Sequence, residues 1–167
     1  MSRTVILIPS RLSATRLPGK PLLKINGVSI ISHVVKKAKE ADLGEVYVAT
    51  EDKEILDDVH LNNGKAILTS NKHKTGSDRI FECFEKLDLK NIDYIINLQG
   101  DEPNIDINDL KHLNKLVHIN KPEIGTLGAE IKDKSSLNNE NIVKVITESK
   151  ITDVNFPIAK DFKRKLK

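Results

Sequence analysis

Cysteine and tryptophan are nearly absent from this 167-residue chain, which has one cysteine, Cys83, and no tryptophan. A single thiol cannot close an internal disulfide, and it cannot build a zinc site from cysteines. This cysteine usage is typical of a reducing compartment. We therefore expect a cytoplasmic protein, with Cys83 inside the core.

The chain also has few aromatic residues and no basic character spread over its length. Four Phe and two Tyr leave little material for stacking on nucleic-acid bases. The formal net charge is +3, but residues 160–167 hold five positive charges and one negative charge, so residues 1–159 carry a net charge of −1. We expect residues 160–167 to be a solvated basic tail, and we expect no nucleic-acid partner.

Long hydrophobic runs are missing as well. No segment approaches the length needed to cross a membrane, and the N-terminus lacks the apolar region of a signal peptide. Neither a Walker A motif nor a G-x-G-x-x-G motif occurs, which excludes the P-loop and dinucleotide fingerprints. With 38% apolar and 31% charged residues, residues 1–159 are predicted to form one globular domain that does not associate with a membrane.

What the sequence does contain is an alternation of short apolar runs and amphipathic segments. Helical spacing predicts helices at 29–42, 53–63, 77–87 and from 106 onward, and the apolar runs predict strands at 5–8, 45–50, 65–69, 94–98, 126–131 and 142–147. Pro9 should end the first strand, and Asp52 should cap the second helix. This order predicts an α/β fold, with a mostly parallel sheet covered by helices on both faces.

The loop after the first strand, residues 9–20, carries three cations among small residues. Arg11, Arg16 and Lys20 lie among serines and Gly19, and two prolines restrict the backbone. Backbone N–H groups of such a loop can approach a polyphosphate, and the cations can offset its charge. The alternative is a set of ordinary surface charges beside a turn.

A second polar segment, residues 70–79, should reach the same edge of the sheet, because ligands of open α/β folds bind beyond the carboxyl ends of the strands. This segment leads into a predicted helix. Thr75 or Ser77 can be the helix N-cap, and Asp78 is a favourable first-turn charge. Arg79, if it turned towards the cleft, would add a fourth cation.

A third polar segment, residues 99–102, follows the predicted strand at 94–98. Asp101 stands on a rigid support there and can hold Mg²⁺ against a triphosphate; a turn residue or helix cap is the alternative. Gln99 has donors and acceptors that suit a sugar hydroxyl or a base edge. Gly100 allows close approach of a backbone or a ligand.

Taken together, three segments resemble the 3-deoxy-manno-octulosonate (KDO) cytidylyltransferase family. They are residues 8–22, residues 74–79 (Lys-Thr-Gly-Ser-Asp-Arg) and residues 97–103 (Asn-Leu-Gln-Gly-Asp-Glu-Pro). The likeness extends from about residue 4 to residue 146. It implies a Rossmann-like three-layer α/β/α nucleotidyltransferase fold. It also implies transfer of CMP from CTP to KDO, with Mg²⁺ as cofactor and release of pyrophosphate, in lipopolysaccharide biosynthesis.

The resemblance also implies roles for individual residues. Arg11, Arg16 and Lys20 would hold the triphosphate, and Arg11, Lys20 and Asp101 would be the catalytic residues. Asp101 would bind Mg²⁺, and Gln99 would contact the KDO sugar. The remaining nucleotide-binding residues would be Pro9, Ser10, Gly76, Ser77 and Arg79.

The chain departs from the family pattern in its last part. The family normally continues further, with more KDO contacts, a second metal-binding aspartate and most of its dimer interface, whereas this chain ends at Lys167. Asn155-Phe-Pro-Ile158 stands where the family has an aromatic pair followed by Ser-Arg, and Lys72 stands where the family usually has an acid. Three hypotheses follow: a CMP-transferring enzyme, a truncated homologue that binds nucleotide without turnover, and one half of a split enzyme.

Overall fold

The computed structural model describes residues 3–13, 17–152 and 154–165. Residues 1–114 and residues 115–167 form two compact units, which are described separately. The first unit contains the sheet and all three polar segments that the sequence singles out. The assignment of residues 1–159 to one domain stays a prediction.

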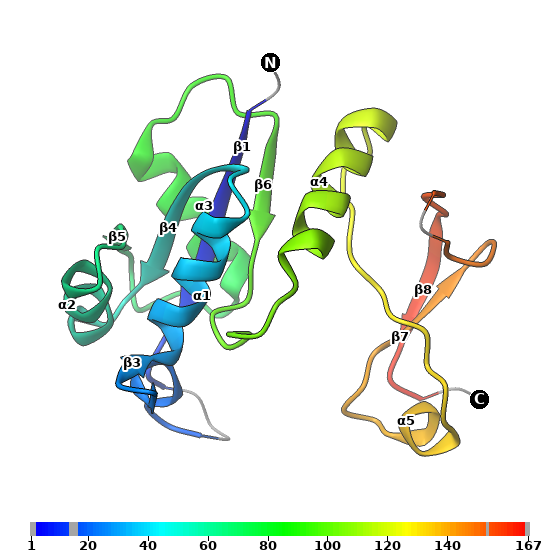
Figure 1. Cartoon of the computed structure of the whole chain (residues 1–167), viewed down its shortest axis with the longest axis horizontal. Helices are drawn as coiled ribbons and strands as arrows, with labels where there is room; N and C mark the ends of the chain where they lie inside the picture. The colour runs from blue at the N-terminus through cyan, green and yellow to red at the C-terminus, as the bar shows by residue number, and fades with distance from the viewer. Residues whose placement is uncertain (1–2, 14–16, 153, 166–167) are drawn as a thin grey trace. The chain divides into compact units, whose positions relative to one another are not determined.

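A four-stranded parallel sheet organises the first unit (Figure 1). Thr4 of the first strand lies opposite both Gly44 and Tyr94, so this strand has a neighbour on each side. The chain builds the sheet outward from its first strand in one direction and then returns to the other side, as doubly wound folds do. The spatial order is β5-β4-β1-β6, with the bounds β5 (Ala66–Leu68), β4 (Gly44–Thr50), β1 (Thr4–Ser10) and β6 (Tyr94–Asn97).

Helices join these strands, and most elements begin and end within two residues of their predicted bounds. Between β1 and the first helix lie a one-turn 3-10 helix, η1 (Lys20–Leu22), and a short hairpin of β2 (Lys24–Ile25) and β3 (Val28–Ser29). The side chain of Ser29 accepts a bond from the Ser32 amide at 3.2 Å, which caps the helix that follows. The helices are α1 (Ile30–Glu40), α2 (Lys53–Leu61), α3 (Gly76–Leu87) and α4 (Ile107–Asn120).

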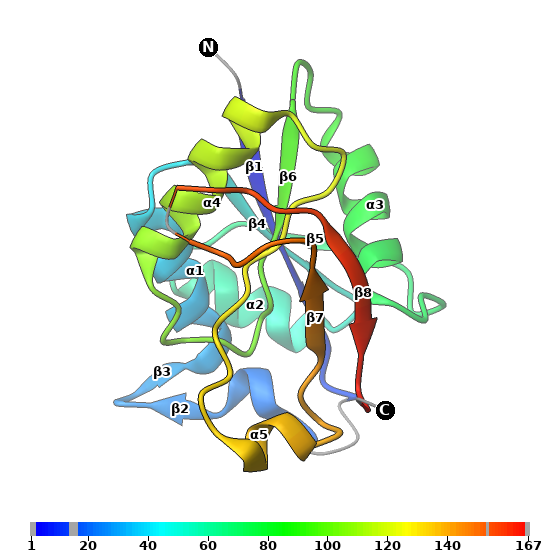
Figure 2. The same ribbon diagram turned by 90° about the vertical axis from the view of Figure 1, so that its right-hand side faces the viewer.

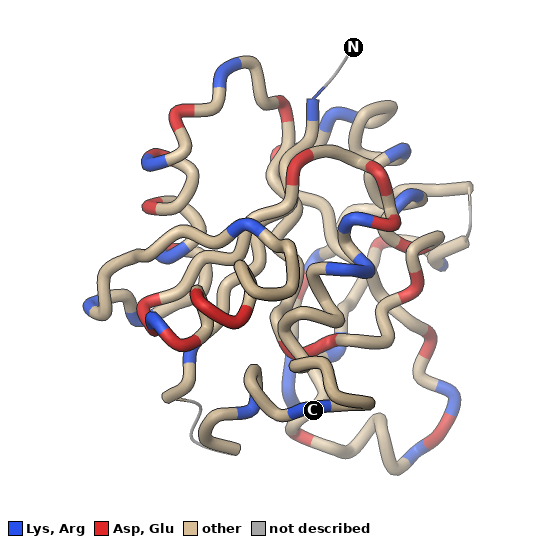
Figure 3. Tube along the Cα trace, turned by 60° about the vertical axis from the view of Figure 1, so that its left-hand side comes forward, with Lys and Arg blue, Asp and Glu red and all other residues tan. Residues whose placement is uncertain are grey.

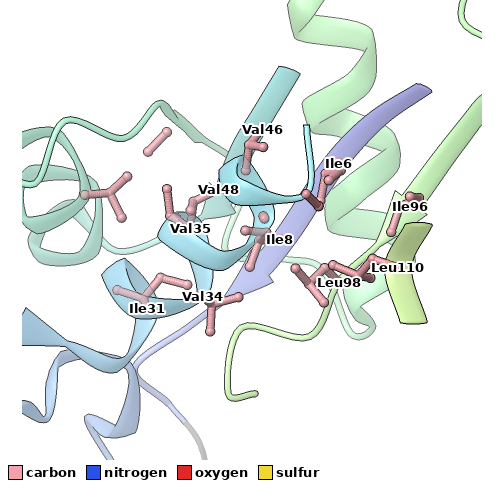
Figure 4. Packing of buried hydrophobic residues seen from close by; sticks show 14 of the residues in the cluster. Ile6, Ile8, Ile31, Val34, Val35, Val46, Val48, Ile96, Leu98 and Leu110 are labelled. Atoms are coloured by element: carbon pink, nitrogen blue, oxygen red, sulfur yellow. The ribbon is translucent and has the colours of Figure 1, made fainter. Parts of the chain in front are cut away.

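Side chains of β1 alternate between two cores, which accounts for the three layers. Ile6 and Ile8 lie in one core together with buried residues of α1, α2 and α4 (Figure 4). Val5 and Leu7 lie in the other core with Cys83 of α3. These four side chains, at positions 5–8 of β1, are at most 1% exposed, as expected for a parallel strand covered on both faces. The predicted α/β fold with helices on both faces is confirmed.

Strand β1 continues through Pro9, so the prediction that Pro9 ends the strand is wrong. Pro9 lies opposite Ala49 of β4, whereas the pairing of β1 with β6 ends at Leu7 and Asn97. The carbonyl of Leu7 accepts a bond from Leu98 on the β6 side, and residues two apart on a strand face the same neighbour. The nitrogen of Pro9 therefore turns to the side where the ladder has ended, and its missing N–H costs no ladder bond.

After the end of α4, the second unit contains a short helix, α5 (Lys134–Asn138), and an antiparallel hairpin of β7 (Lys144–Thr147) and β8 (Ala159–Lys163) (Figure 2). Residues 160–163 of the predicted solvated tail are thus part of a strand. The strand predicted at 126–131 is absent from this segment, so that prediction is wrong. A strand needs a hydrogen-bonded neighbour, and an apolar pattern alone does not supply one.

Charge of both signs is distributed along the chain rather than collected by sign. Figure 3 shows positions of Lys and Arg interspersed with positions of Asp and Glu. Of the helices that the structure describes, none is both long enough and apolar enough to span a membrane. The cytoplasmic location stays a prediction.

Candidate functional site

The order in which the chain adds strands to the sheet reverses between β1 and β6. Chain connections leave β1 towards β4 on one side, and β6 is added later on the other side. Open α/β sheets bind ligands beyond the carboxyl ends of strands at such a point. The loop after β1 and the segment after β6 both begin there, which makes this edge the candidate site.

Pro9 joins the three polar segments that the sequence predicts to meet. A Cβ added to Gly76, the first residue of α3, would lie 3.2 Å from Cγ of Pro9. A Cβ added to Gly100, after β6, would lie 2.9 Å from the carbonyl oxygen of Pro9. Both glycines therefore allow their segments to pack directly against the end of β1. The convergence of the three segments, predicted from the strand order, is confirmed.

Lys20 and Asp101 form an ion pair across this edge. The Nζ atom of Lys20 lies 2.8 Å from Oδ2 of Asp101, although the two residues are 81 positions apart in the chain. Their side chains are 34% and 52% exposed, so both charged groups remain accessible to a ligand. The structure thus brings together a cation and a hard carboxylate, the two groups that a magnesium-bound polyphosphate requires.

The loop before Lys20 is closed by backbone bonds at its base. The Gly19 amide donates to the Leu12 carbonyl at 3.0 Å, and Gly19 has a φ of 70°, in the left-handed region that favours glycine. Arg11 is exposed at the start of the loop. Arg16, the remaining predicted cation, lies outside the described residues.

The side chain of Asp52 forms a hydrogen bond with the backbone of this loop, a contact that the sequence does not predict. Its Oδ2 accepts a hydrogen bond from the Leu12 amide at 2.7 Å. Asp52 occupies the N-cap position of α2, but its side chain makes no capping bond, so the prediction that it caps this helix is wrong. The physical reason is competition: the one carboxylate is engaged by an amide from a distant loop.

Ser10, at the end of β1, contributes an unsatisfied hydroxyl to the site. Its Oγ is buried, and within the described part of the chain it has no hydrogen-bond partner. Buried polar atoms are normally paired, because an unpaired one loses its bonds to water without replacement. A ligand atom is one partner that could complete Ser10.

The N-terminus of α3 is capped by side chains at the start of the helix itself. Thr75 and Asp78 form a capping box, in which the Asp78 amide donates to Oγ1 of Thr75 at 3.2 Å and the Thr75 amide donates to Oδ2 of Asp78 at 3.3 Å. Thr75, not Ser77, is therefore the N-cap. Ser77 is exposed on the first turn and makes no capping bond.

Arg79 lies inside the protein rather than in the open cleft. Its side chain is 3% exposed; it pairs with Glu51 and donates to Oγ1 of Thr69 at 2.6 Å and to the Ser70 carbonyl at 3.3 Å. These bonds tie α3 to the ends of β4 and β5. A nucleotide contact by Arg79 stays a prediction.

Glu82 anchors the loop before α3, another contact that sequence reasoning does not reveal. Its carboxylate accepts from the Ser70 amide at 2.9 Å, pairs with Lys86 at 2.7 Å, and forms an ion pair with His73. Bonds from Lys86, from the Ser70 amide and from His73 lower the pKa of Glu82 from 4.5 to about 2. The spacing of Glu82 and Lys86, four residues on a helix, is the one local signal for this cluster.

Gln99 and Asp101 are the two predicted site residues in the segment after β6. Gln99 is exposed, and its Nε2 donates to Oδ1 of Asn97 at 3.1 Å, which leaves its carbonyl oxygen open. No group of three or more His, Cys, Asp or Glu side chains suited to a metal occurs among the described residues. Asp101 is exposed and is not part of such a group, and its role as a metal ligand stays a prediction.

The family model described as Cytidylyltransferase matches residues 5–165. Two curated relatives are named 3-deoxy-manno-octulosonate cytidylyltransferase. That of Nitrobacter winogradskyi is 44% identical over 146 residues, covering 87% of this chain and 58% of the relative. That of Afipia carboxidovorans is 45% identical over 144 residues, covering 86% and 58%.

Solved structures give the same result. A CMP:2-keto-3-deoxy-manno-octonic acid synthetase complexed with CTP superposes with a TM-score of 0.80 at 35% identity, covering 98% of this chain and 64% of the other. A cytidylyltransferase from Leptospira borgpetersenii gives a TM-score of 0.62 at 28% identity, covering 75% and 52%. This chain thus spans about three-fifths of the length of the curated relatives. The resemblance and the Rossmann-like nucleotidyltransferase fold predicted from the motifs are confirmed, and the chain belongs to the cytidylyltransferase family.

Proposed function

We propose that this protein transfers CMP from CTP to KDO and releases pyrophosphate, as a step of lipopolysaccharide biosynthesis in the cytoplasm. The observation that carries the proposal is the ion pair of Lys20 and Asp101 at the carboxyl edge of the sheet. The names of the relatives, which contain both the nucleotide group and the sugar acid, support this choice of substrates.

On the nucleotide side, Lys20, Arg11 and Arg16 would bind the triphosphate. A triphosphate carries several negative charges, and the charge on the leaving pyrophosphate grows as the bond to the α-phosphorus breaks. The positive side chains of the loop would offset this charge. The other proposed nucleotide contacts are Pro9 and Ser10 at the end of β1, Gly76 and Ser77 at the start of α3, and Arg79.

Asp101 is proposed as the protein ligand of Mg²⁺. Magnesium in such sites is held by one or two carboxylates together with substrate phosphates, and a partly exposed single aspartate fits this pattern. When bound, the ion would neutralise phosphate charge and help to orient the triphosphate. Asp101 would then exchange Lys20 for the cation, and Lys20 would be free to bind phosphate oxygens.

On the sugar side, Gln99 is proposed to bind hydroxyl groups of KDO. The anomeric hydroxyl of KDO attacks the α-phosphorus of CTP in line with the bond to the β-phosphate oxygen. A bond from sugar oxygen to phosphorus forms, the bond to pyrophosphate breaks, and the hydroxyl proton is lost to solvent or phosphate. The residues of this chain therefore bind, orient and neutralise.

A second candidate function is nucleotide binding without turnover, or turnover only together with another polypeptide. The chain spans 58% of the length of a relative that is 44% identical to it and that is named for the activity proposed above. Both candidates share a CTP site at the same edge of the sheet, and they differ in whether this chain alone converts KDO.

The deciding experiment measures CTP binding first and turnover second. CTP with Mg²⁺ at saturating concentration should raise the melting temperature through a stabilisation of a few kcal/mol, about 3 at 100 times the dissociation constant. GTP at the same concentration is the control for nucleotide choice. Pyrophosphate release from CTP that depends on KDO then supports the enzyme; binding without release supports the second candidate; and an unchanged melting temperature with CTP contradicts both.

A further inference from the structure

Asp52 has the backbone of a helix N-cap and the contacts of a loop anchor. Its φ of −98° and ψ of 122° are extended, as at an N-cap, and α2 begins at the next residue. Its carboxylate nevertheless makes no bond to that helix and accepts the Leu12 amide at 2.7 Å, 40 residues earlier in the chain. Its own amide is held by Oγ1 of Thr50 at 3.1 Å, at the end of β4.

Leu12 is fixed through its side chain and both of its backbone polar groups. The side chain packs against the core that contains Ile6 and Ile8, the amide donates to Asp52, and the carbonyl accepts the Gly19 amide at 3.0 Å. The bond between the Gly19 amide and the Leu12 carbonyl therefore joins Gly19 to a residue that Asp52 holds. Lys20 follows Gly19 immediately, so its position depends on how Leu12 is held.

We propose that Asp52 is a positioning residue for the CTP site: by holding Leu12, and through Leu12 the adjacent Gly19, it keeps Arg11 and Lys20 in place to bind the nucleotide. This inference rests on the proposed function. A bond to a charged acceptor is stronger than one to a neutral acceptor, and this one links the loop to β4 rather than to itself. Without it the loop spends less time in the binding geometry, and the apparent affinity falls by that fraction.

Three variants separate positioning from helix capping. Asp52→Ser keeps a good N-cap oxygen, but its side chain is one bond too short to hold Leu12. Asp52→Asn keeps an acceptor of the original length and removes the charge. Asp57→Ser makes the same replacement at an exposed aspartate of the same helix, and is the matched control.

The measurements are the dissociation constant of CTP in the presence of Mg²⁺, by calorimetry, the melting temperature, and the hydrogen exchange of the Leu12 amide. Asp52→Ser should weaken CTP binding about 10-fold or more and speed exchange at Leu12, with little change in melting temperature. Asp52→Asn should stay within about threefold of the wild type, and Asp57→Ser should equal it.

The outcomes distinguish this inference from the function on which it rests. Wild-type affinity in Asp52→Ser overturns the positioning role and leaves the proposed function intact. A loss of CTP affinity in Asp52→Asn as large as in Asp52→Ser, with wild-type hydrogen exchange at the Leu12 amide, also overturns it, because the bond to Leu12 would then be intact while CTP binding is weakened. A wild-type protein that does not bind CTP overturns the proposed function, and this inference with it.

Discussion

Nζ of Lys20 lies 2.8 Å from Oδ2 of Asp101. Lys20 stands at the end of the loop after β1, and Asp101 stands just after β6. In the proposed function, Lys20 binds phosphate oxygens and Asp101 binds Mg²⁺, so a magnesium–nucleotide complex would replace this ion pair. Because both side chains are partly exposed, the pair contributes little to the stability of the fold. Function and stability can therefore be separated here by mutation.

Lys20→Ala should reduce pyrophosphate release about 100-fold or more, because a fixed cation next to the leaving group stabilises the charge that develops there. The free energy of unfolding should change by less than about 1 kcal/mol. Lys24→Ala, at an exposed lysine of β2, is the control and should retain full activity. Substantial activity in Lys20→Ala would show that the phosphate-binding role belongs to another residue.

Asp101→Ala should abolish metal-dependent turnover and leave the melting temperature of the free protein nearly unchanged. The reason is that a single carboxylate is the proposed protein ligand of Mg²⁺, and no other suitable group of side chains occurs among the described residues. Chelation by EDTA should have the same effect on the wild type. Glu102→Ala, at the exposed neighbouring acid, serves as the control; activity in Asp101→Ala at ordinary Mg²⁺ concentrations would refute the assignment.

Because of Glu82, the free energy of unfolding should decrease as the pH falls below about 4.5. The pKa of Glu82 is lowered to about 2 in the folded protein, so the stabilisation is present above the unfolded value of 4.5 and is lost as the pH falls from there towards 2. Glu82→Gln should cost about 1 kcal/mol at pH 7 and progressively less towards pH 2.

Urea unfolding between pH 7 and pH 2.5 measures this effect, with Glu85→Gln on the same helix as the exposed control. A difference between wild type and Glu82→Gln that stays constant down to pH 2.5 would contradict the assigned pKa. Faster exchange at the Ser70 amide in Glu82→Gln would show directly that the carboxylate holds the loop.

Gly100→Ala should destabilise the protein by about 1–3 kcal/mol, because the new methyl group would lie 2.9 Å from the Pro9 carbonyl and 3.2 Å from Cδ1 of Ile31. The backbone at Pro9 cannot move without disturbing the end of β1. Gly128→Ala is the matched control, since its nearest atom is a flexible Cδ1 of Ile151 at 3.6 Å. The test compares the melting temperatures of the two variants. Equal values would mean that the backbone at position 100 can move away from the Pro9 carbonyl without cost.

The sequence by itself determined the layers of this protein, because they depend on local patterns. The continuous apolar run at residues 5–8 predicts a strand buried on both faces, with Ile6 and Ile8 in one core and Val5 and Leu7 in the other, and helical spacing predicts the buried side of α1. The parallel alternation of strands and helices also predicts that the polar segments after β1 and β6 lie at the same edge of the sheet. That β1 and β6 are neighbours, and that Lys20 bonds to Asp101, is shown by the tertiary structure.

Only the tertiary structure decided which polar groups bond to each other across long distances in the chain. Asp52 and Arg79 stand at positions that predict a helix cap and an open cation, yet one holds Leu12 and the other is buried against Glu51. Pro9 fits within β1 only because β6 ends before it. The physical reason is the same for all three. The hydrogen-bond partner of a residue depends on which distant segments the folded backbone brings next to it, and the local sequence does not specify those segments.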